Sequence, residues 1–386
     1  MSKNLISNIR NLVLLLLGFT FPLSVSLSNI LVVLLAVIIL VEGNFSEKIQ
    51  KINSSKWMKS ILIFLAMYII YWIIFGSFTD TFWMVKRISL ILLLPIFYSS
   101  SFSEKTIQKS VFAFLISMFL SSVIAIAENY EIINLNPNWT ISAFLKYTDH
   151  NVFLAFSLII SFYSLFAIKL ENKYRDIILF FIPVYLFSLF TEGGKSGQLV
   201  FLFSVILFLI FLFKKKWKLL LLSLMSVFVF SSIVYNTSDI VKNRFNYEAK
   251  NILQNRKSDR NILLKETIIL IKKNPIFGYG TGSFTDEFGS VNEETQKVVS
   301  NQHKTPHNNY LYVWFELGIL GLIVFLAIFY FQIKELIKKE DGSFIILFPI
   351  MFLIIMFADS YLFSQNTLVL YLFLSVITIN YQCKPS

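Results

Sequence analysis

The sequence is poor in the residues that build redox and metal centres. It contains one cysteine, Cys383, and only three histidines: His150, His303 and His307. A single cysteine can form neither an internal disulfide nor a CxxC metal site. Charged residues make up only 15% of the chain, whereas soluble proteins carry about 25%. These shortages exclude thiol redox chemistry and argue against a soluble domain.

Apolar residues are abundant instead. They make up 56% of the chain, which includes 42 phenylalanines. Apolar runs of about 17–25 residues recur along the chain. Runs of this length cross a bilayer as helices, because a helix satisfies its own backbone hydrogen bonds. The sequence therefore predicts an all-α, polytopic membrane protein of about twelve transmembrane helices. The predicted spans are 11–26, 28–42, 57–75, 82–100, 107–127, 149–168, 176–190, 196–213, 217–235, 307–331, 343–358 and 361–380.

The basic residues predict the orientation of these spans. If the N-terminus is cytoplasmic, nearly all lysines and arginines of the short connections fall on the inside, as the positive-inside rule requires. The net charge of +11 then reflects membrane topology, and we expect no nucleic-acid partner. Both termini are predicted to be cytoplasmic, and the first apolar run is expected to be an uncleaved helix. The inside residues are Lys3, Arg10, Lys48, Lys51, Lys56, Lys59, Lys105, Lys109, Lys169, Lys173, Arg175, Lys214, Lys215, Lys216, Lys218, Lys334, Lys338, Lys339 and Lys384.

One long connection divides the chain into three parts. Residues 1–235 hold the first nine spans, 236–306 form a large outer loop, and 307–386 hold the last three spans. Within the loop, Ser258 or Asp259 is a predicted cap for an amphipathic helix that ends before Pro275. We expect this helix to lie on the membrane surface or over the bundle.

The segment NPIFGYGTGSF follows this helix and has Gly278, Gly280 and Gly282 at alternate positions. Two interpretations remain open. The glycines form a flexible turn, or their backbone amides form a cradle for an anionic group.

The stretch TPHNNYL contains the strongest candidate for acid–base chemistry. Thr305 is a suitable cap and Pro306 a suitable first helical residue, which places His307 in the first turn. A helix N-terminus disfavours imidazolium and keeps the ring able to accept a proton. The alternative is an interfacial histidine that hydrogen-bonds a loop carbonyl. A zinc site with His303 is not expected, because Pro306 separates the pair and no ligand set completes a tetrahedron.

Several basic residues fall on the predicted outer side, near His307. The stretch TEGGKSG lacks the first glycine of a phosphate loop, since position 189 is Leu189, and it connects two spans outside, where ATP is absent. It leaves Lys195 at an outer turn, and Lys86 and Arg87 lie near the outer end of the fourth span. Snorkelling to the interface explains such residues, and a functional role inside the bundle is the alternative.

Together with Arg260, these cations predict a basic outer cavity with one proton acceptor. Carboxylates at the same level are Glu128, Asp149, Glu192 and Asp359. Arginine and lysine stabilise a diphosphate, while a base activates an attacking hydroxyl. The pattern therefore favours a lipid-linked diphosphate substrate that reaches the site from the membrane.

Two motifs then resemble a known family. RNILLKETIILIKKNPIFGYGTGSF and HNNYLYVWFELGILGLIVF together cover about 70 residues, Asp259 to Phe325. They are similar to the signature region of the O-antigen ligase and polymerase family of bacterial inner-membrane enzymes, which transfer lipid-linked glycans. The resemblance implies a GT-C-type, inverting glycosyltransferase that uses an undecaprenyl-diphosphate glycan as donor, without metal or other cofactor. Its active site would face the periplasm.

The resemblance also implies roles for single residues. His307 matches the essential histidine, the proposed base, and Arg260 matches the arginine that engages the diphosphate. Lys195 stands where many relatives have arginine, which puts bidentate phosphate recognition there in doubt. Lys86 and Arg87 are predicted to add to the diphosphate site. Glu316, Asn308, Gly278 and Gly280 are predicted to support it, with a structural role for Glu316 as reasonable as a catalytic one.

The same signature fits two acceptors. A ligase transfers the glycan to lipid A-core, whereas a polymerase joins lipid-linked repeat units. We expect the ligase, because the single compact outer loop leaves little surface for holding a long chain in register. A polysaccharide transporter or lipid flippase is a further alternative, which the asymmetric placement of polar residues on one side disfavours.

Overall fold

The computed structural model describes residues 3–75, 81–135, 141–167, 172–237, 242–243, 246, 259–300, 303–339 and 342–381. These residues are almost entirely helical, which confirms the all-α class, and one short antiparallel strand pair, β1 (Ile141–Ser142) with β2 (Leu145–Lys146), follows α7. The helices are α1 (Lys3–Thr20), α2 (Val25–Val41), α3 (Phe45–Ser54), α4 (Lys56–Phe75), α5 (Thr81–Ile91), α6 (Leu93–Ser99), α7 (Glu104–Asn129), α8 (Tyr147–Ala167), α9 (Asn172–Thr191), α10 (Lys195–Phe213), α11 (Trp217–Thr237), α13 (Asp259–Lys273), α14 (Phe284–Gly289), α15 (Glu293–Ser300), α16 (Asn309–Leu336), α17 (Gly342–Ile345), α18 (Leu347–Ile355), the 3-10 helix η1 (Tyr361–Phe363) and α19 (Gln365–Asn380).

Each of the twelve predicted spans overlaps helical segments, although span 11–26 runs past the end of α1 into α2. In the described part of the chain, six helices are long and apolar enough to cross a bilayer: α4, α7, α8, α9, α10 and α16. A seventh crossing results if α2 and α3, which meet at a bend of 114°, count as one span. The protein is thus a multi-pass membrane protein, and the count of twelve crossings stays a prediction.

Two predicted spans are broken in the structure. Segment 82–100 is divided into α5 and α6, and segment 343–358 into α17 and α18. In each case a proline, Pro95 or Pro349, is the third residue of the second helix. Proline lacks an N–H group and fits only in the first turn of a helix. A new helix therefore starts just before each proline.

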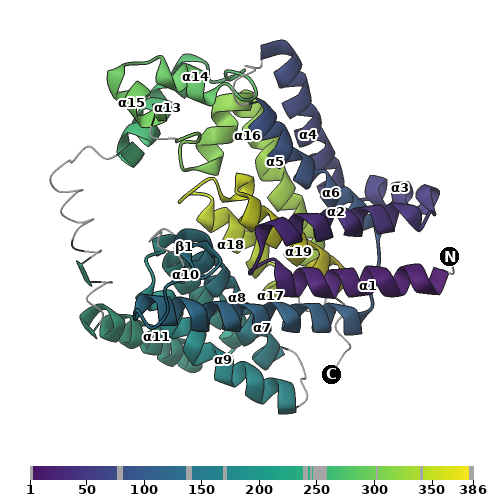
Figure 1. Cartoon of the computed structure of the whole chain (residues 1–386), viewed down its shortest axis with the longest axis vertical. Helices are drawn as coiled ribbons and strands as arrows, with labels where there is room; N and C mark the ends of the chain where they lie inside the picture. Colours follow the sequence, from purple (N-terminus) through teal and green to yellow (C-terminus); the bar gives the residue numbers. More distant parts are fainter. Residues whose placement is uncertain are drawn as a thin grey trace.

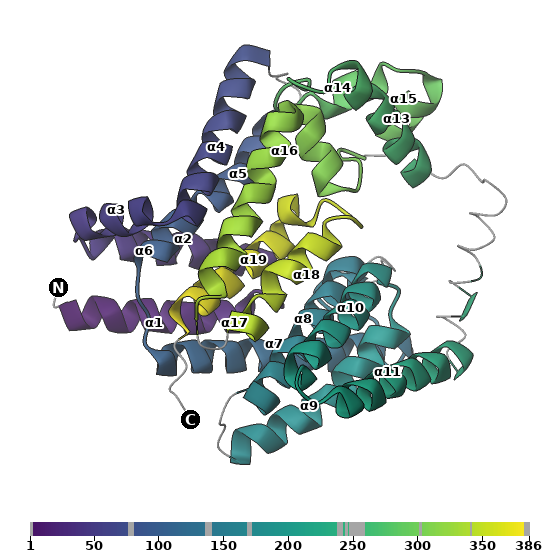
Figure 2. The same cartoon turned by 180° about the vertical axis from the view of Figure 1, so that it is seen from behind.

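Helices α8, α18 and α19 lie in the middle of the molecule, between α4 with α16 and α7 with α9 (Figures 1 and 2). Of the span in α8, 83% is buried, and every residue of α19 from Thr367 to Thr378 is buried. The N-terminal ends of both helices carry polar side chains. The packing of α8 and α19 in the middle of the molecule therefore fixes the position of their polar N-terminal ends.

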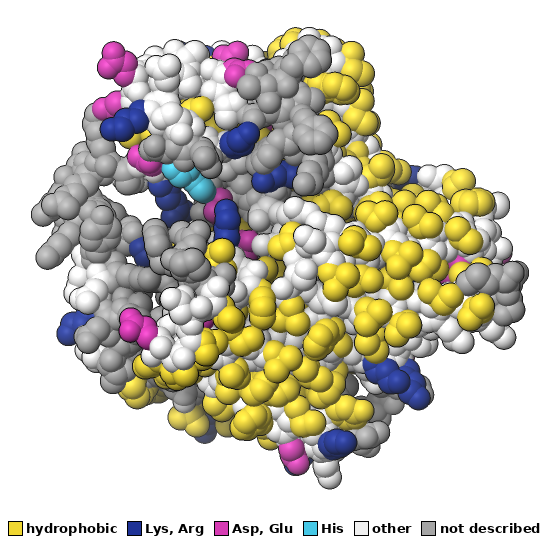
Figure 3. All heavy atoms as spheres, in the orientation of Figure 1, with side chains coloured by type: hydrophobic (Ala, Val, Ile, Leu, Met, Phe, Trp, Pro, Cys, Tyr) yellow, Lys and Arg dark blue, Asp and Glu magenta, His cyan; other side chains and the backbone are white. Residues whose placement is uncertain are grey.

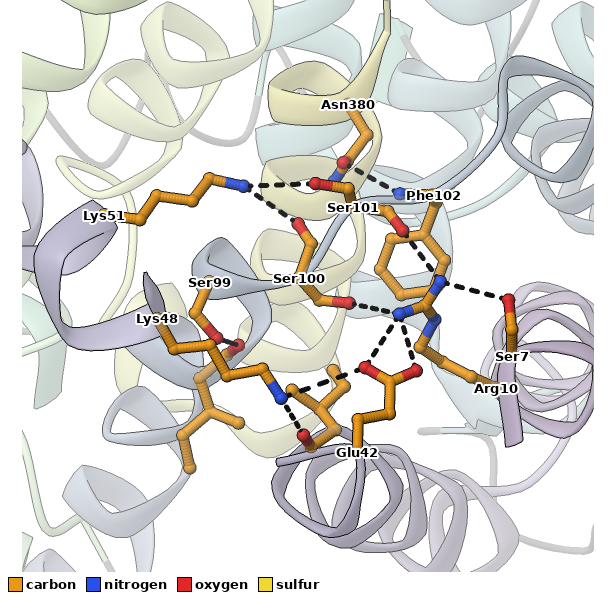
Figure 4. A network of polar contacts seen from close by, with 12 residues as sticks. Ser7, Arg10, Glu42, Lys48, Lys51, Ser99, Ser100, Ser101, Phe102 and Asn380 are labelled. Atoms are coloured by element: carbon orange, nitrogen blue, oxygen red, sulfur yellow. Dashed lines mark hydrogen bonds and ion pairs between the residues drawn. The ribbon is translucent and has the colours of Figure 1, made fainter. Parts of the chain in front are cut away.

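A polar network joins the N-terminal helices to the end of α19 (Figure 4). Arg10 donates from Nη1 to both carboxylate oxygens of Glu42, at 2.6 and 2.8 Å, and from Nη2 to the Ser101 carbonyl at 2.8 Å. Lys51 donates to the Ser100 carbonyl at 3.1 Å, and the Phe102 amide donates to Asn380 at 3.0 Å. Residues predicted to set topology therefore also hold helix ends together.

The glycine-rich turn after α13 packs onto a kink in α16. Gly318 has φ 66° and ψ −170° inside this helix. The break frees the carbonyls of Phe315 and Glu316, which accept from the amides of Tyr279 at 2.8 Å and Gly280 at 2.9 Å. A Cβ on Gly318 would lie 1.9 Å from the Ile276 carbonyl oxygen. Only glycine provides both this backbone conformation and this close approach.

We expect Gly318→Ala to lower the free energy of unfolding by more than about 2 kcal/mol, since it adds a backbone clash to an unfavourable φ. Thermal unfolding of the detergent-solubilised protein, followed by tryptophan fluorescence, measures the effect. Two control variants separate the causes. A Cβ on Gly43, where φ is 73°, would meet nothing within 4 Å, and a Cβ on Gly289 would meet only Val299 at 3.7 Å. Equal losses for Gly318→Ala and Gly43→Ala would contradict the packing argument.

Candidate functional site

His307 lies just before α16, not in its first turn as predicted. The helix starts at Asn309, and its cap is Asn308, whose side-chain oxygen accepts from the Leu311 amide at 3.0 Å. Asparagine is a better cap than threonine, so it displaces the predicted cap at Thr305. His307 itself has φ 51°, in the left-handed region. The prediction that the helix dipole keeps this ring neutral therefore loses its geometric basis.

Asp359 provides the partner that orients His307. Nδ1 of His307 lies 2.8 Å from Oδ1 of Asp359. Since an ionised carboxylate only accepts hydrogen bonds, Nδ1 is the donor, and Nε2 of a neutral ring is then the proton-accepting nitrogen. The partner of His307 is therefore a carboxylate and not a loop carbonyl, which was the alternative interpretation of the sequence. The sequence pattern marked Asp359 only as one of four outer carboxylates.

The surroundings of Asp359 favour its ionised form. Burial alone raises the pKa of this carboxyl, but the hydrogen bond and charge of His307, the Ser360 amide and the charge of Arg260 together lower the pKa below its usual value. The Ser360 amide donates to the same Oδ1 atom at 2.6 Å. An anionic Asp359 stabilises the imidazolium that His307 forms when it accepts a proton.

His303 completes this cluster on the opposite side of the His307 ring. Its Nδ1 lies 3.1 Å from Nε2 of His307, and its Nε2 lies 3.6 Å from Oδ2 of Asp259. The pKa of His303 is lowered by burial and by the charge of His307, which outweigh the opposing effects of Asp259 and Asp359. Among the described residues no group of three or more His, Cys, Asp or Glu side chains has metal-binding geometry.

Two of the predicted cations border the segment from Ala358 to Phe363. Arg260, at the start of α13, donates from Nη2 to the Ala358 carbonyl at 2.9 Å. Arg87, in α5, donates to the Phe363 carbonyl and lies close enough to Asp359 and Asp149 for attractive charge interactions. The side chain of Lys86 lies outside the described residues.

Lys195 begins α10, and the next residue, Ser196, interacts with the side chain of Tyr361 in η1. The TEGGKSG stretch is glycine-rich because α10 starts against α8, where a Cβ on Gly197 would lie 2.2 Å from the Asn151 carbonyl oxygen. On the face shown in Figure 3, histidine side chains lie at the edge of a hollow with basic and acidic side chains around it. The structure thus brings His307, Arg260 and Arg87 to the segment from Ala358 to Phe363, and Lys195 precedes a residue that contacts the same segment.

The glycine-rich turn does not present an anion cradle to this region. The amides of Gly278 and Gly280 donate to the carbonyls of Asn274 and Glu316, at 3.2 and 2.9 Å. The Gly282 amide donates to Oε1 of the fully buried Glu316 at 2.8 Å. The Glu316 side chain is therefore what the Gly282 amide binds, and these amides do not form a cradle for a ligand. The flexible turn stays an interpretation. Glu316 and the glycines hold α16 in place.

A second polar cluster lies deeper, at the start of α8. His150 and Glu192 are in contact at 2.8 Å with side chains 0% and 1% exposed. Asn366, at the start of α19, donates to Asp149 at 2.9 Å. No motif in the sequence predicts a role for His150. This cluster joins α8, α9 and α19 beneath the His307 region.

Comparison with known proteins supports the resemblance stated from the motifs. A family model described as O-antigen ligase matches residues 178–326. The chain is also 27% identical over 258 residues to the O-antigen ligase of Salmonella typhimurium, an alignment that spans 63% of this chain and 60% of that protein. The family match contains Lys195, Arg260, His307 and Glu316, whereas Asp359 lies beyond its end.

The lowered pKa of Asp359 predicts how its contribution to stability depends on pH. An aspartate whose pKa is lower in the folded state stabilises the fold above its unfolded pKa, near 4. This contribution is lost as the pH falls through the lower folded pKa. We expect Asp359→Asn to lower the thermal midpoint at pH 7, and the difference from wild type to shrink below about pH 4.

Thermal unfolding in detergent between pH 3 and pH 8, roughly the range in which aspartate titrates and folds persist, measures this difference. Asp176→Asn is the matched control, because its side chain is 69% exposed. A gap between wild type and Asp359→Asn that stays constant across this range would contradict the predicted ionisation.

Proposed function

We propose that this chain, with its match to the O-antigen ligase family over residues 178–326, is an inverting, metal-independent glycosyltransferase. In this proposal it transfers a glycan from undecaprenyl diphosphate to lipid A-core. It acts in the bacterial inner membrane, with its site on the periplasmic side and both termini in the cytoplasm. The observation that carries the proposal is the oriented His307–Asp359 pair next to Arg260 and Arg87.

The proposed reaction uses the two sides of this region differently. Nε2 of His307 accepts the proton of the acceptor hydroxyl as its oxygen attacks the anomeric carbon. The bond from that carbon to the phosphate oxygen breaks, and the diphosphate leaves with the electron pair. Arg260, Arg87 and Lys195 stabilise the negative charge that grows on the leaving group. Attack opposite to the leaving group inverts the anomeric centre.

Topology supports the periplasmic placement. The basic network joins Arg10 of α1 to Lys48 and Lys51 of α3, whereas His307 follows the long loop. Basic residues of short connections mark the cytoplasmic side. A lipid-linked donor would then reach the site within the outer leaflet.

The similarity to a named ligase favours lipid A-core as the acceptor, and so a ligase over a polymerase. The Salmonella typhimurium relative is named an O-antigen ligase. An assay with purified protein, undecaprenyl-diphosphate-linked glycan and lipid A-core tests this choice. Growth of glycan on the polyprenyl carrier in the absence of core would establish the polymerase alternative. Movement of the lipid across the bilayer without bond formation would instead indicate a flippase.

We expect His307→Ala to reduce glycan transfer by about 10²–10⁴-fold, because the acceptor hydroxyl loses its base. The readout is product formation by purified enzyme, with size-exclusion chromatography to show that the variant is folded. Lys218→Gln, an exposed residue at the start of α11, is a control that should retain wild-type transfer. Unchanged transfer by folded His307→Ala would exclude the proposed base.

Exchanging the cation at position 195 tests its role in diphosphate binding. Lys195→Arg should keep transfer within about threefold, because positive charge is retained and arginine adds a second donor to a phosphate. Lys195→Gln should raise the KM for the donor by roughly tenfold, the effect of about 1.4 kcal/mol. Equal donor KM values for wild type and Lys195→Gln would show that Lys195 does not bind the diphosphate.

A further inference from the structure

His303 touches the nitrogen that the proposed reaction uses. Its Nδ1 lies 3.1 Å from Nε2 of His307, and the two rings stand at 75° with centroids 5.2 Å apart. The left-handed φ of His307, 51°, turns the chain back so that a residue only four positions earlier reaches the ring. A histidine has no packing advantage at this partly exposed position, so its nitrogen atoms need an explanation.

The cluster forms a chain of four titratable groups. Asp359 contacts Nδ1 of His307, Nε2 of His307 contacts Nδ1 of His303, and Nε2 of His303 faces Asp259 at 3.6 Å. Each of these three contacts is favourable only when it holds one proton, because carboxylates and unprotonated ring nitrogens are all acceptors. Two neutral imidazoles carry only two N–H protons.

The three contacts between these four groups therefore lack one proton when both imidazole rings are neutral. When Nδ1 of His307 donates to Asp359, Nε2 of His307 carries a lone pair. Nδ1 of His303 then either donates to this lone pair or faces it with a lone pair of its own, depending on the tautomer of His303. One added proton satisfies all three contacts at once. The acceptor hydroxyl releases one proton in each cycle of the proposed reaction. The four groups lack the same number of protons when both rings are neutral.

We propose that His303 is a positioning residue that shares the proton taken up by His307, with Asp259 as its counter-charge. The inference rests on the proposed function. In the step, the acceptor hydroxyl takes the place of His303 at Nε2 of His307, its O–H bond breaks, and its proton binds Nε2. The glycosylated oxygen then leaves, and His303 returns to this nitrogen. The resulting N–H then donates to Nδ1 of His303, whose own N–H points to Asp259. Water receives the proton from this partly exposed end after the product leaves.

The charges around His303 set the direction of its titration. Asp259 and Asp359 raise its pKa, while burial and His307 lower it. Arg260 lies next to Asp259 in α13, and Lys304 follows His303 in the chain. Asp259 is the anion in contact with the ring, so removing its charge lowers the pKa of His303 further. His303 then stays neutral to a lower pH.

The first test compares two nucleophiles. We expect His303→Leu to reduce kcat with hydroxyl acceptors on the order of 10–100-fold, the usual cost of removing a group that orients an imidazole. With azide as the nucleophile the variant should match wild type within about twofold, because this anion has no proton to release. Equal loss with both nucleophiles, or no loss with hydroxyl acceptors, would overturn the proposal.

The second test measures the pH dependence of transfer. Asp259→Asn should move the acidic limb of the kcat profile to lower pH, whereas Glu293→Gln, an exposed carboxylate of α15, should leave the limb in place. An unmoved limb in Asp259→Asn would contradict the shared proton. This profile decides the question should wild type not accept azide.

The two hypotheses fail in different ways. If wild type transfers no glycan to any acceptor, the proposed function is wrong. If wild type transfers glycan and His303→Leu does so at the same rate, the function stands and only the role of His303 is wrong.

Discussion

The 2.8 Å contact between His307 and Asp359 is the interaction on which the candidate site depends. It joins residues 52 positions apart, and both belong to breaks between helices rather than to helices. Loop residues hold a fixed geometry only when their backbone is fixed by other bonds. The rest of the C-terminal region provides these bonds.

The start of α16 is bonded to the segment that carries Asp359 on both sides of that residue. The Asn309 amide donates to the Met356 carbonyl at 2.9 Å, and the Tyr310 hydroxyl donates to the Leu353 carbonyl at 2.6 Å. Beyond Asp359, the Leu362 amide donates to the side chain of Asn309 at 3.1 Å. The Asn309 side chain is fully buried, so its hydrogen bond is formed away from water, where losing it is costly. These hydrogen bonds therefore hold the two loops against each other.

The sequence motifs predicted the residue types of the site better than its geometry. The H-N motif identified His307, but the position of the helix start was wrong because Asn308, and not Thr305, caps α16. Asp359 stood out only as a carboxylate between two apolar segments. Its partner could not be predicted, since no local periodicity links residues so far apart in the chain. The glycine pattern indicated a flexible turn or an anion cradle, whereas α16, the helix that the turn packs against, lies outside the pattern.

The two sequence motifs combine two kinds of residue with different physical roles. Glu316 and Gly318 face inward, where the first accepts from the Gly282 amide and the second leaves room for the Ile276 carbonyl. His307 and Arg260 lie at the partly exposed end, close to Asp359. The buried half of the motif fixes the angle between the outer loop and α16, and the loop carries Asp259 and Arg260. A change in the glycine turn would thus move Arg260 relative to the imidazole without touching either group. This dependence links the loop, the turn and the helix start of this chain, all of which lie in the region matched by the family model.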